Sequence, residues 1–286
     1  MKPAAFRYHR AGSAEEAAGL LAELGDEAKL LAGGQSLVPM MNFRLLRPSA
    51  LVDISRLKDL SYIRPDGDGI CIGALTRHIE VQEMPAGLAP GFEVLPKAAA
   101  LVGHYSIRCA GTFGGSIAHA DPSSEWCAIA LLLDAEISAL GPKGFRVIHA
   151  EDFFKGFLTT DLLPDEMLVE VRLPRPPSRA GLREFSRRAG DFAVVLAAAA
   201  VDLDGKRCTG ARIVLGGVAP RPIRVREAES VLIGERLDAS AADAAAVAAA
   251  SVIDPPADIH GSSEYRRAVA QTMLKSLLLE LSDEST

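Results

Sequence analysis

Two glycine pairs restrict what this chain can fold into, because each brings bare backbone and a serine hydroxyl into one turn. They lie in Ala32-Gly33-Gly34-Gln35-Ser36 and in Gly111-Thr112-Phe113-Gly114-Gly115-Ser116. Adjacent glycines allow positive φ values and close approach of another group to the main chain. Successive N–H groups in such turns form concave anion sites, and serine adds a hydroxyl donor. One pair alone indicates only a turn, whereas two suit one diphosphate held from both sides.

The spacing of these glycines excludes two common nucleotide-binding motifs. Neither turn fits G-x-G-x-x-G or G-x-x-x-x-G-K-S/T, so a Rossmann dinucleotide site and a P-loop are not indicated. A third pair, Gly216-Gly217, has no hydroxyl after it, and we interpret it as the end of a strand. The net charge of −6 gives no basic footprint for nucleic acid or anionic membranes. A phosphate-bearing ligand must therefore be held by local geometry.

The pattern of apolar segments predicts mixed helices and strands in three parts. The first part begins with a helix that Ser13 caps, with Glu16 completing a capping box, and that Gly25 ends. Predicted strands lie at 28–32, 50–54, 70–72, 136–140, 168–173, 182–188, 192–203 and 209–218. Further predicted helices lie at 92–102, 123–133, 239–251 and 262–282. Consecutive prolines at 174–178 favour an extended linker, which predicts a boundary there.

The cysteines and the hydropathy of the sequence indicate in which cellular compartment the protein works. The four cysteines, at positions 71, 109, 127 and 208, form no C-x-x-C pair, which predicts buried thiols in a reducing compartment. They also argue against an iron–sulfur cluster or zinc site within this chain. The N-terminus has no apolar run typical of a signal peptide, and the longest apolar stretch, 192–201, is about half of a membrane span. We expect a soluble, cytoplasmic protein.

Further segments around the two turns give the chain a specific resemblance. In order, they are Leu37-Val38-Pro39, Arg44, Pro48, Leu51-Val52-Asp53-Ile54, Ile107-Arg108, His119-Ala120-Asp121-Pro122, Gly190-Asp191-Phe192-Ala193 and Tyr265-Arg266-Arg267. With them, the chain resembles the FAD-binding medium subunit of the molybdenum hydroxylases, the family of xanthine dehydrogenase and carbon monoxide dehydrogenase. The resemblance covers about residues 1–280.

The resemblance implies an α+β fold and a set of cofactor contacts. The expected fold is a two-lobed α/β FAD-binding domain followed by a C-terminal subdomain of a small antiparallel sheet with helices. The expected boundaries are 1–56, 57–174 and 175–286. The residues expected to bind FAD are Lys29, Leu30, Ala32, Gly33, Gly34, Gln35, Ser36, Leu37, Val102, Gly111, Thr112, Gly114, Gly115, Ser116, His119, Glu125, Leu168 and Phe192. Phe192 stands where close relatives have a tyrosine near the isoalloxazine ring, which puts a hydrogen bond from that position in doubt.

The resemblance also implies a function as an electron relay. FAD in this chain would take electrons from 2Fe-2S clusters on a small partner subunit and pass them to an outside acceptor. Molybdopterin would lie on a large partner subunit, and the assembly would be a dimer of heterotrimers. The alternatives are a self-sufficient FAD oxidase or dehydrogenase, and a structural subunit that has lost its cofactor. Substrate and final acceptor stay open.

Several single residues have two interpretations each. His119, Asp121 and Glu125 fit either an acid–base or cofactor role, or a helix that starts at Asp121-Pro122 with Glu125 in its first turn. Arg108 either neutralises phosphate or supports its loop. For Lys29, just before the first turn, a phosphate-binding role and a structural role are equally favoured. Arg44, Arg47 and the pair Arg187-Arg188 are predicted to be surface residues first, and the stripe Val269, Met273 and Leu277 to be a docking surface.

Overall fold

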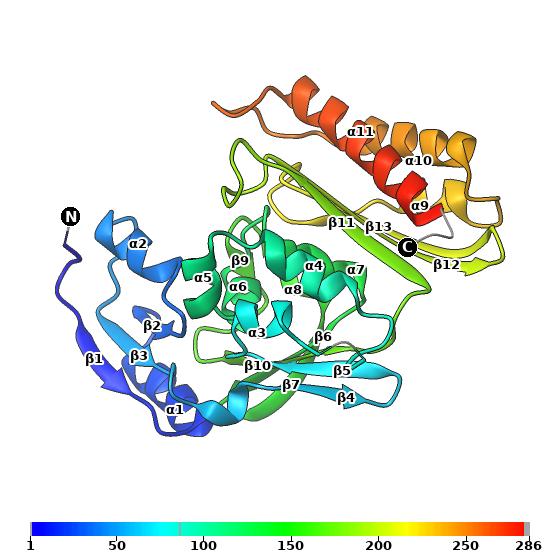
Figure 1. Ribbon diagram of the computed structural model, residues 1–286. Helices are drawn as coiled ribbons and strands as arrows, with labels where there is room; N and C mark the ends of the chain where they lie inside the picture. Colours follow the sequence, from blue (N-terminus) through cyan, green and yellow to red (C-terminus); the bar gives the residue numbers. More distant parts are fainter. Residues whose placement is uncertain (1, 86, 283–286) are drawn as a thin grey trace.

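The computed structural model describes residues 2–85 and 87–282 and has an α+β fold, as predicted (Figure 1). Its strands form sheets of three, five and four strands, and a further two-stranded sheet. The first lobe contains β1 (Arg7–Arg10), α1 (Ala14–Leu24), β2 (Ala28–Leu31), α2 (Leu37–Asn42) and β3 (Ala50–Asp53). Its sheet has the order β1-β3-β2, and both pairings are parallel.

Local capping defines α1 in the way its sequence indicates. The Ser13 hydroxyl accepts from the Glu16 N–H at 3.1 Å, and Gly25 ends the helix with φ +74°. The Glu16 carboxylate, however, accepts from the Gly12 N–H at 2.7 Å, so the predicted reciprocal box shifts by one residue. The buried stripe of α1 includes Ala17 and Leu21 and packs in one core with strands of the first and second lobes.

The second lobe is built on the five-stranded sheet, whose order is β4-β5-β10-β6-β7 and whose pairings are all antiparallel. Its strands are β4 (Ile63–Asp66), β5 (Gly69–Gly73), β6 (Glu136–Gly141), β7 (Gly144–His149) and β10 (Met167–Leu173), with the small pair β8 (Phe154–Gly156) and β9 (Thr159–Thr160). Its helices are α3 (His78–Gln82), α4 (Val94–Leu101), α5 (Tyr105–Ala110), α6 (Phe113–His119), α7 (Glu125–Leu132) and α8 (Ala150–Phe153), and the 3-10 turn Lys58–Leu60 precedes β4.

The C-terminal part is an antiparallel sheet covered by helices. Its strands are β11 (Arg179–Phe185), β12 (Val195–Asp204), β13 (Arg207–Gly216) and β14 (Ile223–Arg224), in that spatial order. Its helices are α9 (Arg226–Leu232), α10 (Ala239–Val252) and α11 (Ser263–Ser282). The segment predicted as one strand at 182–188 starts and ends three residues earlier, because 186–194 forms a loop. The domain boundaries at 56/57 and 174/175 stay predictions.

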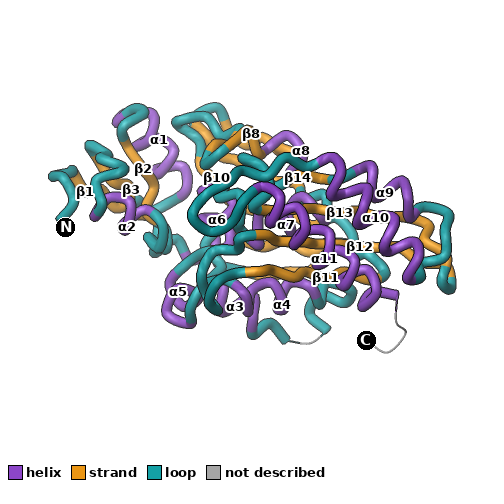
Figure 2. Tube along the Cα trace, turned by 90° about the horizontal axis from the view of Figure 1, so that it is seen from above, coloured by secondary structure: helices purple, strands orange, loops and turns teal. Residues whose placement is uncertain are grey.

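The strand β12 explains how the layers stack. Leu196, Ala198 and Ala200 belong to the core shared with the second lobe, whereas Ala197 and Ala199 belong to the core under α9–α11. Successive strand side chains point to opposite faces, so a continuous apolar run is what a strand buried on both faces needs. The small alanines let helices approach from either side. Figure 1 shows the resulting order of layers: five-stranded sheet, helices, four-stranded sheet and C-terminal helices. The first lobe lies beside these layers, as the view from above also shows (Figure 2).

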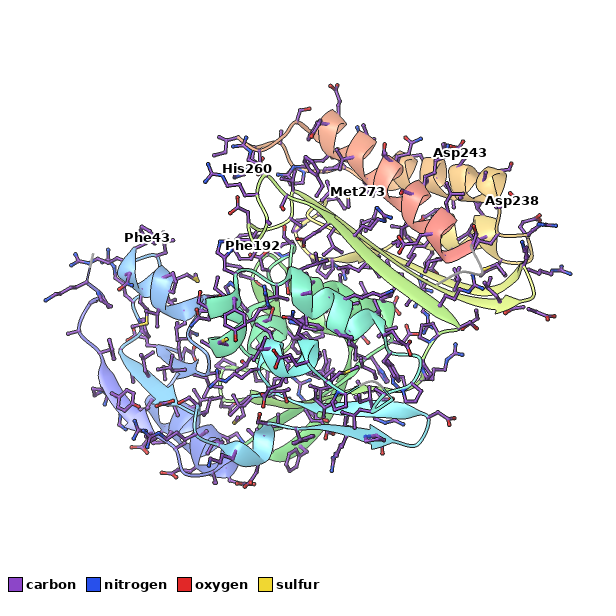
Figure 3. The ribbon with its side chains drawn as sticks, in the orientation of Figure 1. Phe43, Phe192, Asp238, Asp243, His260 and Met273 are labelled. Atoms are coloured by element: carbon purple, nitrogen blue, oxygen red, sulfur yellow. The ribbon has the colours of Figure 1, made fainter. Side chains whose placement is uncertain are left out.

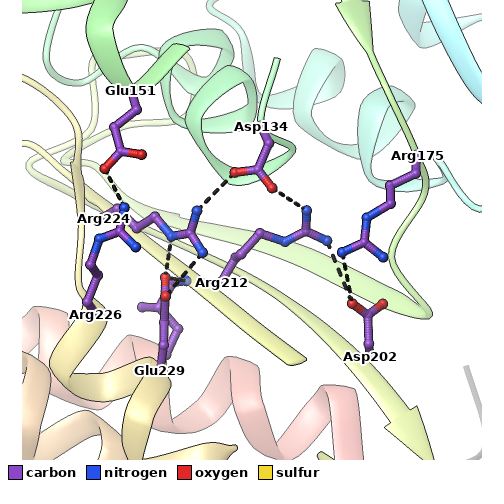
Figure 4. A network of polar contacts seen from close by, with 9 residues as sticks. Asp134, Glu151, Arg175, Asp202, Arg212, Arg224, Arg226 and Glu229 are labelled. Atoms are coloured by element: carbon purple, nitrogen blue, oxygen red, sulfur yellow. Dashed lines mark hydrogen bonds and ion pairs between the residues drawn. The ribbon is translucent and has the colours of Figure 1, made fainter. Parts of the chain in front are cut away.

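An ion-pair network joins the second lobe to the C-terminal sheet (Figure 4). Asp134, in the turn between α7 and β6, accepts from Arg212 of β13 at 2.7 Å and from Arg224 of β14 at 2.9 Å. The buried Glu229 of α9 in turn pairs with Arg224 at 2.7 Å and accepts from the Ile213 N–H. Because burying a charge is costly unless it is paired, these contacts define how the two parts meet.

The apolar stripe of α11 is used within the chain. Leu277 is buried, and Val269 and Met273 pack against the same core as α9 and α10. The stripe predicted to be a docking surface therefore docks α11 onto its own sheet. The pair Gly216-Gly217 lies at the end of β13, as predicted.

Arg266 anchors α11 to the chain just before β12 and just after β13. It is buried, donates to the carbonyls of Val194 and Gly217, and pairs with Asp258 at 2.7 Å.

Arg266→Met is expected to lower the free energy of unfolding by about 2–4 kcal/mol, because two buried carbonyls lose their donor. Denaturant unfolding followed by circular dichroism measures this loss. The control Arg267→Met removes only longer contacts, to the Ile253 carbonyl at 3.2–3.4 Å and to the exposed Asp254 carboxylate at 3.5 Å, and should change stability by less than about 1 kcal/mol. Equal losses would contradict the anchoring role.

Candidate functional site: a cleft between the glycine turns

A cleft of about 620 Å³ opens between the first lobe, the second lobe and the loop 186–194. It contains both glycine turns, although about 80 residues of chain separate them. Every residue that the sequence predicted to contact the cofactor lines this cleft: Lys29, Leu30, Ala32, Gly33, Gly34, Gln35, Ser36, Leu37, Val102, Gly111, Thr112, Gly114, Gly115, Ser116, His119, Glu125, Leu168 and Phe192. The structure therefore brings the whole predicted set together, while the contact that each makes stays a prediction.

The first turn presents unused main-chain donors. It follows β2, and Gly34 adopts φ +70°, which favours glycine. Its carbonyls start α2, since Gly34 accepts from the Val38 N–H at 3.0 Å and Ser36 accepts from the Met40 N–H at 3.1 Å. Within residues 2–85 and 87–282, no protein acceptor bonds the N–H groups of residues 33–36. Consecutive free N–H groups at a concave turn are the arrangement that binds anions.

In the second turn, most main-chain N–H groups bond acceptors within the protein. Phe113 donates to the Thr76 carbonyl at 2.8 Å and Gly114 to the Ala74 carbonyl at 2.9 Å. Thr112 caps α6, with its hydroxyl accepting from the Gly115 N–H at 3.2 Å. Of the two similar donor-rich turns that the sequence predicts, only the first keeps its N–H groups free, because the carbonyls of Ala74 and Thr76 accept from Gly114 and Phe113 in the second. Toward the cleft this turn presents Thr112 and Ser116, whose hydroxyls also bond the Gly115 N–H and the Ser124 hydroxyl.

The two turns touch through their backbones. A Cβ on Gly33 would lie 2.3 Å from the Ala110 carbonyl oxygen and 2.8 Å from the Gly111 Cα. A Cβ on Gly114 would lie 2.6 Å from the Cα of Ala74, so this turn is also pressed onto the strand end below it. Arg77 donates to the same Ala110 carbonyl. Glycine is needed at position 33 because only bare backbone fits this contact.

Apolar side chains form the walls of the cleft. Leu30 comes from β2, Val102 from the end of α4 and Leu168 from β10. Phe192, in the loop before β12, is 69% exposed at the rim. In the view of Figure 3 it lies to the right of Phe43, which follows α2, and below His260, which precedes α11. An exposed aromatic ring at the rim of an apolar cleft is suited to stacking on a flat ligand.

An acidic corner lies at the start of α7. The helix begins at Glu125 after Ser124, two residues later than the predicted 123. The alternative start at Asp121-Pro122 is three residues early, whereas Glu125 does lie in the first turn. Burial raises the pKa of Glu125 to about 8, with smaller contributions of the same sign from Glu184 and Asp121. In the described part of the chain, no side-chain donor bonds this carboxyl group. Burial also lowers the pKa of His119.

Cationic side chains contribute little to the cleft. Arg108 donates from Nη1 to the Val102 and Gly103 carbonyls, so it supports its loop. Lys29 lines the cleft but lies on its exposed side. Arg44 and the pair Arg187-Arg188 are exposed, as predicted, and so is Arg47. An anion in this cleft would therefore be held by main-chain donors, as the net charge of the chain requires.

The cleft also contains residues that the sequence prediction left out. They are Met40, Leu46, Ile54, Ala74, Leu75, His78, Gly103, Ile107, Ala118, Asp121, Ser124, Leu158, Gly190 and Asp191. The position of Ala74, Leu75 and His78 directly after the apolar strand β5 was a usable signal, since ligands often bind where strands end. Leu158 carried no such signal, because only the packing of the β8–β9 turn brings it to the cleft.

Comparisons with known proteins place the chain. Residues 4–176 match the FAD binding domain in molybdopterin dehydrogenase, and residues 180–281 match the C-terminal domain of CO dehydrogenase flavoprotein. The 6-hydroxypseudooxynicotine dehydrogenase complex subunit alpha of Paenarthrobacter nicotinovorans is 44% identical over 97% of this chain and 95% of its own length. The carbon monoxide dehydrogenase medium chain of Afipia carboxidovorans is 37% identical, with 96% of both chains covered. The structure of quinoline 2-oxidoreductase from Pseudomonas putida 86 matches with a TM-score of 0.94 and 37% identity, covering 99% and 98% of the two chains.

The chain belongs to the family of FAD-binding medium subunits of the molybdenum hydroxylases. The donor groups and walls of the cleft fit FAD. Free N–H groups at 33–36 suit a pyrophosphate, and the apolar walls suit a flat ring. Within the described residues, no helix combines the length and the apolar character needed to cross a bilayer.

The contact between the turns gives a first prediction for the site. Gly33→Ala is expected to lower the free energy of unfolding by about 1–3 kcal/mol, because the new methyl group overlaps the Ala110 carbonyl and the lobes must separate. Gly19→Ala, in α1, is the control: nothing lies within 4 Å of its Cβ, so it should stabilise by about 0.5–1 kcal/mol. Denaturant unfolding measures both. A Gly33→Ala protein as stable as the wild type would disprove the backbone contact.

The titration of Glu125 gives a second prediction. Its folded-state pKa of about 8 lies above its ordinary value of 4.5, so between these values the folded protein holds a proton that the unfolded chain releases. Stability therefore falls as the pH rises through this interval. Glu125→Gln removes that loss, and its melting temperature should rise relative to the wild type from about pH 5 to pH 8.

Calorimetry of the cofactor-free protein at several pH values measures the difference. The control is Glu15→Gln, since hydrogen bonds from its own backbone and Ser13 lower the pKa of this exposed carboxyl group. Above about pH 6 Glu15 is ionised in both states, so from there to pH 8 that difference should stay constant with pH. A constant difference for Glu125→Gln as well would show that its carboxyl is not buried in the folded protein.

Proposed function

We propose that this chain is the FAD-carrying electron-transfer subunit of a molybdenum hydroxylase, and that the cleft between the two glycine turns holds the cofactor. The observation that carries the proposal is the run of free N–H groups at 33–36, held against the second turn in a chain of this family. Bound FAD supplies the electron-accepting and electron-donating chemistry of its isoalloxazine ring, and the protein sets its position and surroundings.

The chain's own residues divide the binding work. The first turn donates to the pyrophosphate, and the hydroxyls of Thr112 and Ser116 face the adjoining chain of the cofactor. Leu30, Val102 and Leu168 exclude water along the walls. Phe192 stacks at the rim and, lacking a hydroxyl, makes no hydrogen bond. The protonated Glu125 can donate a hydrogen bond at neutral pH, because burial keeps it uncharged.

Partner subunits complete the enzyme in this proposal. Relatives are named as medium chains or complex subunits, which supports a large molybdopterin subunit and a small subunit with 2Fe-2S clusters as partners. A dimer of these heterotrimers and a cytoplasmic location belong to the same proposal, the latter supported by four unpaired cysteines. Relatives named for 6-hydroxypseudooxynicotine, carbon monoxide and quinoline share this fold at 35–44% identity, which favours a substrate pocket on another chain.

A self-sufficient FAD oxidase is the less favoured alternative. It would need a substrate site beside the cofactor. A second groove, of about 580 Å³, lies between the start of α1 and the strand β10, but it shares no lining residue with the cleft. A substrate bound there would lie apart from a flavin in the cleft, which supports the relay over the oxidase.

The spectrum of the purified chain tests the proposal. Released FAD is expected on denaturation, and Gly34→Val combined with Gly115→Val should abolish it, because position 34 has φ +70° and a Cβ at position 115 would lie 2.5 Å from the Thr112 hydroxyl. Gly205→Val is the matched control, with φ +59° and nothing within 4 Å, far from the cleft. It carries similar backbone strain and should keep FAD.

Each outcome separates one function from the others. FAD that survives in the double variant would exclude the cleft as the binding site. A wild-type chain without flavin, even after reconstitution with FAD and both partner subunits, would leave the structural subunit as the function. A lone yellow chain that oxidises small molecules, with no molybdenum or iron partner, would favour the oxidase. Light scattering of the co-expressed complex tests the dimer of heterotrimers.

A further inference from the structure

His78 is a buried polar residue that lines the cleft and that the fold does not use fully. It is the first residue of α3 and is 4% exposed. Its backbone N–H donates to the Gly111 carbonyl at 3.2 Å, so the second glycine turn holds it in place. On the interior side of the ring, the indole Nε1 of the fully buried Trp126 donates to Nδ1 at 3.0 Å, and the two rings stack at an interplanar angle of 25°.

The bond from Trp126 decides which nitrogen carries the proton. An indole N–H can only donate, so Nδ1 must be the acceptor and must be unprotonated. Burial, with smaller contributions of the same sign from the charges of Arg77 and Arg108, lowers the pKa of His78 to about 4. The ring is therefore neutral at physiological pH, and its one proton is on Nε2.

The protonated nitrogen is on the cleft side of the ring. A Cβ on Gly111 would lie 2.7 Å from Nε2, so the absence of a side chain at this position lets the imidazole edge approach the second turn. Gly111 lines the cleft as well, whereas Trp126 does not. In the described residues, no protein acceptor bonds Nε2, and this atom is not among the buried polar atoms without a partner. It therefore reaches accessible space at the cleft.

We infer that His78 is a cofactor-binding residue whose Nε2–H donates to an acceptor oxygen in the pyrophosphate or ribityl part of FAD, past Gly111. The inference rests on the proposed function, because it adds a donor to the same cleft. It also compensates for the second turn, most of whose main-chain N–H groups bond within the protein. A neutral donor locked in one tautomer holds the acceptor at any pH above the acid range, without bringing a charge into the cleft.

Substitution of His78 tests the donor. His78→Leu places an apolar side chain of comparable reach at this position and removes the N–H. It is expected to weaken FAD binding by about tenfold to hundredfold, the range for a lost hydrogen bond to a charged or strongly polar group. His78→Gln keeps an N–H donor near the same place and should stay within a few fold of the wild type. Dissociation constants come from quenching of FAD fluorescence during reconstitution of the full-length chain, with melting temperatures recorded for each variant.

A spectroscopic measurement on the wild type keeps the test valid if a variant fails to fold. The ring ¹⁵N shifts of His78 should report the Nε2–H tautomer in the cofactor-free chain, and the Nε2 resonance should shift when FAD is added. Trp126→Phe removes the bond to Nδ1 and should allow both tautomers in the free chain. The inference is overturned if His78→Leu folds and binds FAD as tightly as the wild type, or if FAD leaves the Nε2 resonance unchanged. A wild-type chain that binds no FAD at all would instead overturn the proposed function.

Discussion

The site depends on one steric constraint, the direct backbone contact between the two glycine turns. Gly33 lies against the Ala110 carbonyl and the Gly111 Cα at distances that no Cβ could share. This contact joins the first lobe, which carries the parallel sheet, to the helices on the antiparallel sheet of the second lobe. Because protein interiors pack tightly and do not deform continuously, one close backbone contact defines how far the lobes stand apart, and with it the width of the cleft.

The same contact explains why the two turns have different roles. Residues 74–78 pair with the second turn and consume the N–H groups of Phe113 and Gly114. That turn is thus a rigid support, while the first turn keeps its donors for a ligand. The cleft holds acidic residues and one exposed lysine, so the field of the side chains does not attract an anion. Oriented main-chain dipoles supply the attraction, and burial keeps Glu125 neutral instead of repulsive.

The C-terminal part contributes to the cleft through a loop and not through its core. Strand β12 buries small side chains on both faces, so helices pack on either side and the loop before it is held at the cleft. Arg266 fixes the end of this loop by donating to the Val194 carbonyl, and the pairs around Asp134 orient the sheet on the second lobe. Phe192 is therefore presented at the rim by contacts that lie well inside the C-terminal part.

The sequence by itself determined the fold class, the helices and strands with strong patterns, and a set of residues that all line one cleft. Capping at Ser13 and Gly25, the apolar run before β12 and the two glycine pairs are local signals, and local signals survive without tertiary information. Only the tertiary structure decided which N–H groups stay free, that α7 begins at Glu125, and that His78 faces the cleft with its proton on Nε2. These features depend on the partner that each group meets across long stretches of chain, such as Trp126 for His78. The sequence names the donors and acceptors, but their pairing is a property of packing.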